Sequence, residues 1–118
     1  MKLDHVAQTL NARMIAGHNL AEVEVAMACG ADLMSDVLAF AKPGALLLTG
    51  LTNVQVVRTA EMIDVRAICF VRGKNPPPET VEVASTGNLP LLATDLPMFE
   101  ACGRLFAEGL AGCSHDGR

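Results

Sequence analysis

The sequence contains 118 residues, of which 51% are hydrophobic, and it carries a formal net charge of −4 at pH 7. A chain of this length is expected to form one domain whose core needs neither a metal nor a disulfide. The basic residues are scattered and Trp and Tyr are absent, which excludes the basic footprint and stacking aromatics of a nucleic-acid-binding protein. No apolar stretch resembles a membrane span or a signal peptide, so we expect a cytoplasmic protein with no nucleic-acid or membrane partner.

The first part of the chain is predicted to contain short elements of both kinds. Apolar residues at helical spacing predict a short helix over residues 2–10, and residues 13–16 are interpreted as a short strand. Alternation of side chains predicts a further strand over residues 23–29. Helical spacing returns over residues 33–41, with Asp32 or Ser35 as the N-cap.

From residue 45 onward, apolar runs and helical patterns alternate. The runs at 45–49, 67–71 and 89–93 predict strands that are buried on both faces. Asn53 is expected to cap the helix after the first run, three prolines lead into the helix after the second, and Thr94 or Asp95 begins the last helix. The expected apolar stripe of this last helix consists of Phe99, Cys102, Phe106 and Leu110, with Glu100, Arg104 and Glu108 paired on the outside.

This order predicts a single α/β domain over residues 1–110. Its βαβαβα unit from residue 45 builds a largely parallel sheet with flanking helices, to which the short N-terminal helix and the strand at 23–29 are added. Residues 111–118 are expected to be a frayed C-terminal tail. The high apolar fraction predicts a homo-oligomer, with a dimer favoured.

Polar and glycine residues follow the predicted strands, where ligands bind in open parallel sheets. Glycine permits close backbone approach, helix N-termini favour anions, and basic side chains add positive charge. The candidate ligand-binding residues are Thr49, Gly50, Asn53, Arg72, Gly73, Lys74, Thr94 and Asp95. The same loops and caps are required at any such turn, and no nucleotide-binding glycine motif is present.

Candidate catalytic groups are few. Asp32 and Asp36 are spaced to share one helix, with Ser35 between them, but such a pair also occurs as a cap plus a solvated face. The three histidines are scattered, so no nucleophile and base can be paired. We assign no catalytic residue.

The four cysteines also lack a site pattern. No pair has C-x-x-C spacing, and clustering with histidine is absent. We expect no disulfide, metal or cofactor, and we interpret Cys29, Cys69 and Cys102 as small buried hydrophobic residues.

A pattern distributed between Gly30 and Leu110 resembles the DRTGG-domain family. The matching segments are Gly30–Leu38, Leu48-Thr49, Val54–Val57 with Ala60, Pro78–Val81, Leu89–Thr94 and Phe99–Gly103, and the N-terminal helix with Ala16-Gly17 fits the family's opening. The family's signature is an Asp-Arg pair after one strand and Thr-Gly-Gly after the next. Leu51-Thr52 and Val71-Arg72-Gly73 stand at those places, so only the last glycine is kept.

The resemblance implies an accessory domain without chemistry of its own. Such domains are similar to the N-terminal domain of HPr kinase/phosphorylase, and they occur beside CBS domains in regulatory pyrophosphatases and inside long phosphate acetyltransferases. Free-standing members, which this chain resembles more, tend to be encoded near iron-only hydrogenase genes. A protein partner in a regulatory or redox-enzyme context is therefore implied.

Three hypotheses follow. The first is a non-catalytic regulatory or dimerisation module, which predicts an apolar self-complementary surface. The second is a sensor of a phosphorylated or carboxylate metabolite, which predicts that the candidate residues converge. The third, a phosphoryl-transfer enzyme, requires Asp32, Ser35 and Asp36 in one cleft.

Overall fold

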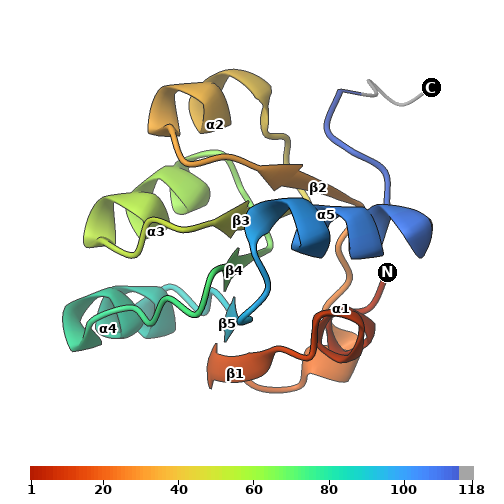
Figure 1. The fold of residues 1–118 in the computed structure, drawn as a ribbon. Helices are drawn as coiled ribbons and strands as arrows, with labels where there is room; N and C mark the ends of the chain where they lie inside the picture. Colours follow the sequence, from red (N-terminus) through yellow and green to blue (C-terminus); the bar gives the residue numbers. More distant parts are fainter. Residues whose placement is uncertain (115–118) are drawn as a thin grey trace.

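A five-stranded sheet with the order β1-β5-β4-β3-β2 forms the centre of the molecule (Figure 1). The structure is a computed structural model, and it describes residues 1–114. Strands β2 to β5 are parallel, and β1 pairs antiparallel with β5 at one edge. The strands are β1 (Arg13–Ala16), β2 (Met27–Gly30), β3 (Ala45–Thr49), β4 (Ala67–Phe70) and β5 (Leu91–Ala93); the helices are α1 (Leu3–Leu10), α2 (Met34–Phe40), α3 (Val54–Met62), α4 (Pro78–Thr86) and α5 (Met98–Ala107), with a 3-10 turn η1 at Leu20–Glu22. The predicted α/β class with a largely parallel sheet is confirmed.

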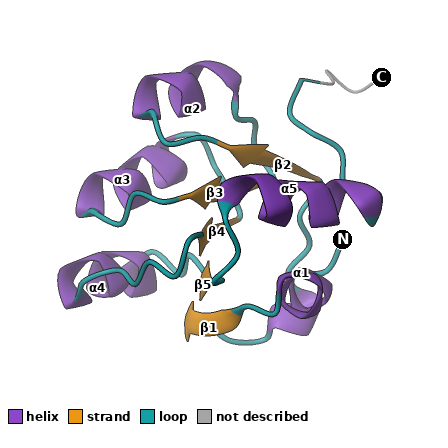
Figure 2. Ribbon diagram, in the orientation of Figure 1, coloured by secondary structure: helices purple, strands orange, loops and turns teal. Residues whose placement is uncertain are grey.

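Helices cover both faces of the sheet (Figure 2). Helices α1 and α5 lie on one face, and α2, α3 and α4 lie on the other. Because neighbouring residues of a strand point to opposite faces, Leu46 and Leu48 of β3 pack toward α1 and α5, whereas Leu47 packs toward the other three helices. This two-sided cover explains why β3, β4 and β5 are buried along their whole length.

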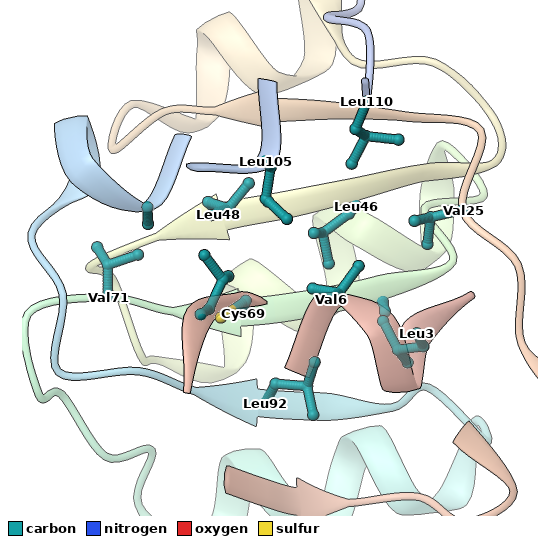
Figure 3. Close-up of a cluster of buried hydrophobic side chains, with 13 residues drawn as sticks. Leu3, Val6, Val25, Leu46, Leu48, Cys69, Val71, Leu92, Leu105 and Leu110 are labelled. Atoms are coloured by element: carbon teal, nitrogen blue, oxygen red, sulfur yellow. The ribbon is translucent and has the colours of Figure 1, made fainter. Parts of the chain in front are cut away.

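The core under α1 and α5 is entirely aliphatic apart from one thiol (Figure 3). Leu3, Val6 and Leu10 of α1 are spaced three and four residues apart and are fully buried there. They meet Leu92 of β5 and Cys69 of β4 from the sheet.

The predicted strand over residues 23–29 is too long, since β2 covers only Met27–Gly30. The residues before it pair with the N-terminus instead: Leu3 donates to the Val23 carbonyl, and Val25 donates to the Met1 carbonyl. Val25 is fully buried in the core under α1. The alternation therefore predicted the burial of Val25 correctly, while the backbone partner at that position is the N-terminus and not the sheet.

The predicted apolar stripe of the last helix is right for Leu110, which is buried, and for Cys102, which packs against the core, but wrong for Phe99 and Phe106. Ala101 and Leu105 face the sheet, whereas the side chains of Phe99 and Phe106 are 87% and 71% exposed. Ala101 and Leu105 are four residues apart and define the buried side of the helix. Phe99 and Phe106 lie on a different side of the helix and are therefore exposed to solvent despite their size. The expected outer ion pairs are absent among the described residues, and Glu108 contacts His5 instead, with Nε2 and Oε1 2.8 Å apart.

Residues 111–113, assigned to a tail from the sequence, run beside β2. Ala28 donates to the Ala111 carbonyl, Ala28 forms a parallel bridge with Gly112, and Cys113 is buried. Residues 115–118 of the predicted tail lie outside the described residues. No helix in the described part of the chain is long and apolar enough to cross a membrane.

Candidate functional site

The carboxyl ends of the four parallel strands lie at one edge of the sheet, which we call the carboxyl edge. The amino end of antiparallel β1 reaches the same edge, because Arg13 pairs with Ala93 at the end of β5. The loops after β2, β3, β4 and β5 therefore meet there. This edge holds the predicted ligand residues and two residues that were not among them, Arg13 and Asp32.

Asp32 joins three of the loops. Its Oδ1 accepts hydrogen bonds from the Gly50 backbone N–H at 2.7 Å and from Thr49 Oγ1 at 3.1 Å, while Oδ2 lies 3.3 Å from Arg72 Nη1. The expectation that Asp32 or Ser35 caps α2 is wrong, because Leu33 is the N-cap residue and no side chain caps this helix. The carboxylate of Asp32 thus accepts hydrogen bonds from the end of β3 and from Arg72, and it does not cap the helix that follows it.

These contacts favour the charged form of Asp32. The Gly50 N–H, then Thr49 and Arg72, hold the pKa of the carboxyl below its ordinary value although burial opposes them. Thr49 and Gly50 are buried at the end of β3, so two of the three donors are fixed by the sheet. Arg72 is the flexible third donor, and its side chain is 44% exposed.

Arg72 is placed by an unusual backbone turn. Both Arg72 (φ 60°) and Gly73 (φ 69°) are left-handed, a conformation that costs a non-glycine residue about 1 kcal/mol. The turn is held by hydrogen bonds from Arg72 to the Leu96 carbonyl and from Gly73 to the Thr94 carbonyl. It directs the guanidinium over Gly50, where a Cβ atom would overlap it.

A second polar group lies beside the first. Arg13 forms an ion pair with Asp95 at 3.5 Å and a hydrogen bond with Asn75. Lys74 is exposed on the same loop as Arg72. The parallel strand ends could have been inferred from the sequence, but Arg13 reaches this edge only because β1 is antiparallel, which no local pattern predicts.

Two predicted site residues are used elsewhere. Asn53 Oδ1 accepts from the Val56 N–H at 3.2 Å and caps α3 as expected. Thr94 is buried, and its hydroxyl donates to the Leu10 carbonyl at 2.7 Å. The structure therefore brings Thr49, Gly50 and Arg72 together, places Gly73, Lys74 and Asp95 on adjoining loops, and turns Thr94 toward α1.

The carboxylate pair required for catalysis is not assembled. Asp32 precedes α2 instead of sharing it with Asp36, and both Ser35 and Asp36 are exposed. Within residues 1–114, no group of three or more His, Cys, Asp or Glu side chains is placed to hold a metal ion.

The cysteines lie close to α5. Burial raises the pKa of Cys69 to about 12 and that of Cys29 to about 11, and for Cys29 the nearby Cys113 and Cys102 add to the effect. Cys69 is fully buried as expected, whereas Cys29 and Cys102 are only partly buried. These thiols are therefore protonated at neutral pH and poor nucleophiles.

An apolar surface runs along the outer side of α5. Phe99, Gly103 and Phe106 recur at intervals of four and three residues and therefore share one side of the helix; we call them the α5 face. With β2 and residues 110–112, the α5 face borders a shallow groove. Arg104 lies on the other side of α5, where it borders a depression with His5, Gln8 and Thr9 of α1.

The fold and the carboxyl edge define an α/β domain with a mostly parallel five-stranded sheet, in which hydrogen bonds to Asp32 join the loops at the carboxyl edge. No family model and no curated protein matches the chain. Among solved structures, it is similar to the CBS and DRTGG domains of the regulatory region of the Clostridium perfringens pyrophosphatase, crystallised with its activator diadenosine tetraphosphate, with a TM-score of 0.76 and 20% identity. The match covers 96% of this chain and 49% of that chain, so this chain spans about half its length. This likeness supports a DRTGG-like fold.

Proposed function

We propose that the chain is a non-catalytic regulatory module that contacts a second copy of itself through the α5 face. The observation that carries this proposal is the exposure of two phenylalanines on one side of a helix. Large aromatic side chains dominate the energetics of protein contacts. The likeness of the fold to a regulatory region is consistent with the proposal.

The spacing of the two phenylalanines favours a copy of the chain as the partner. In an antiparallel pair of α5 helices related by a two-fold axis near Cys102, Phe99 of each copy faces the region of Phe106 in the other. An isologous contact of this kind needs one surface only, and that surface must be complementary to itself. The open space at Gly103, where a Cβ atom would meet no heavy atom within 4 Å, allows close approach at the centre.

Analytical ultracentrifugation over a wide concentration range tests the contact. The unchanged chain is expected to sediment as a dimer, and Phe99→Asp with Phe106→Asp is expected to give a monomer with an unchanged circular dichroism spectrum. Met62→Asp is the matched control, because Met62 is also 71% exposed but lies on α3, across the sheet. A chain that stays monomeric at high concentration, or a dimer that survives the double substitution, overturns the contact.

A sensor of a phosphorylated or carboxylate metabolite at the carboxyl edge is the second candidate. The convergence of donors from Thr49, Gly50 and Arg72 favours it. A thermal-shift screen of the unchanged chain against nucleotides, phosphorylated metabolites and small carboxylates tests it. A ligand at a hundred times its Kd adds about 2.7 kcal/mol of stability, and a screen without any shift counts against a sensor.

A phosphoryl-transfer enzyme has less support, since Asp32 precedes α2 and contacts Arg72, while Ser35 and Asp36 are exposed on the helix. A cytoplasmic location and a partner from a redox-enzyme system near hydrogenase genes stay predictions. If such a partner binds the α5 face, the Phe99→Asp, Phe106→Asp variant should fail to retain it in a pull-down in which the unchanged chain retains it.

A further inference from the structure

The groups around Asp32 have the composition of an anion-binding site. A hydroxyl, a backbone N–H and a guanidinium donate to its two oxygens, at 3.1, 2.7 and 3.3 Å. Such donors recognise carboxylate and phosphate oxygens through the same charge-assisted hydrogen bonds. In this structure the acceptor at the site is the carboxylate of Asp32, which belongs to the chain itself.

We propose that Thr49, Gly50 and Arg72 form an oxyanion-binding site that Asp32 occupies in the absence of ligand, and that a small molecule bearing a phosphate or carboxylate group binds by displacing Asp32. This inference rests on the sensor candidate above and is independent of the α5 face. It adds an internal competitor, which raises the ligand concentration needed to fill the site.

Displacement is feasible because Asp32 is exposed whereas two of its three donors are buried. Asp32 lies between β2 and α2, outside both elements, and its side chain is 42% exposed, so the carboxylate can turn into water. Thr49 and Gly50 are buried at the end of β3 and keep their positions. When Asp32 leaves, their donors require another acceptor, because an unpaired buried donor costs about 1–3 kcal/mol.

Competition by Asp32 should weaken the measured affinity of the site for an external anion. A tethered group competes at an effective concentration of about millimolar or more. If Asp32 fills the site nine times in ten, an external anion meets an empty site in about a tenth of the molecules, and its apparent Kd rises about tenfold. Removing the Asp32 carboxylate should therefore tighten anion binding by at least that factor.

Calorimetric titration of Asp32→Ala and of the unchanged chain with inorganic phosphate tests the inference. We expect the phosphate Kd of the variant to be at least about tenfold lower, and we expect Arg72→Gln added to Asp32→Ala to remove most of that gain. Asp32→Asn provides a second variant of nearly the same shape if Asp32→Ala fails to fold. The same titration with acetate separates the ligand classes, because the tighter of the two probes identifies the group that the site prefers.

The control for charge alone is Asp4→Ala. Asp4 is exposed in the first turn of α1, and the neighbouring Leu3 bonds to Val23, ahead of β2, so this charge lies toward the amino ends of the parallel strands and away from the donors around Asp32. The phosphate Kd of Asp4→Ala is expected to stay within about twofold of that of the unchanged chain, as for a charge separated from the site and screened by salt. An equal gain in Asp4→Ala, or no gain in Asp32→Ala and Asp32→Asn, overturns the inference.

Failure of this inference can be separated from failure of the sensor candidate. If the unchanged chain responds to a ligand in the thermal-shift screen while the Asp32 variants gain no affinity for phosphate or acetate, the sensor stands and the role of Asp32 is overturned. If neither the screen nor the variants show binding, both are overturned.

Discussion

The guanidinium of Arg72 lies in the space that a side chain at Gly50 would need, because a Cβ atom built on Gly50 would overlap Arg72 Nη2. The guanidinium of Arg72 can therefore lie over position 50 only because that residue has no side chain. The same placement sets Arg72 against Asp32. Gly50 is thus a residue whose role depends on a neighbour 22 positions along the chain.

Gly50→Ala should lower the free energy of unfolding by about 1 kcal/mol or less. The overlapping group is the end of a long side chain that can turn into water, and the ion pair that is lost is partly exposed. Urea denaturation measures the change. Gly103→Ala is the control: it meets no atom, lies inside α5, and should raise stability by about 0.5–1 kcal/mol. A loss of several kcal/mol in Gly50→Ala would contradict the mobility of Arg72.

Thr94→Val should cost about 1–3 kcal/mol of stability. The substitution keeps the shape of the side chain but leaves the buried Leu10 carbonyl without the hydroxyl that donates to it. Thr86→Val removes a hydrogen bond of the same type, to the Glu82 carbonyl, at an exposed position. It should change stability by no more than about 0.5 kcal/mol. Equal effects of the two substitutions in urea denaturation would argue against a structural role for Thr94.

Asp32→Asn should reduce the dependence of stability on acid pH. The pKa of Asp32 is lowered in the fold, first by the Gly50 N–H, so the folded state binds this proton less tightly than the unfolded state. The contribution of the carboxylate is therefore present above the unfolded pKa and is lost as pH falls through the lower folded pKa. Unfolding free energies measured from neutral to acid pH should fall more steeply for the unchanged chain, and identical slopes would contradict the contacts of Asp32.

Cys69 should resist alkylation in the folded protein. Burial raises its pKa to about 12, so the thiolate that reacts is scarce at neutral pH, and the sulfur is out of reach of a reagent. Mass spectrometry after iodoacetamide treatment should find Cys69 unmodified until denaturant is added. The partly buried Cys102, whose pKa is also raised by burial, provides the internal comparison and should react earlier. Modification of Cys69 at the rate of the unfolded chain would contradict its burial.

The parts of the fold that the sequence predicted well are those with local causes. The apolar runs that became β3, β4 and β5 are uninterrupted because helices cover both faces of the sheet. Asn53 caps α3 through a bond to a residue three positions away. The errors over residues 23–29 and along α5 arose where a local pattern identified apolar side chains but not what they face.

The candidate site divides in the same way. The sequence by itself determined the types and order of the elements from residue 45, and hence which loops end at the carboxyl edge, because hydrophobic period and turn chemistry act over a few residues. Only the tertiary structure decided that β1 runs antiparallel and delivers Arg13 to that edge, and that Asp32 reaches Arg72, 40 residues away. Such pairs depend on the order of strands in the sheet, which is fixed by the packing of the whole domain and not by any segment of it.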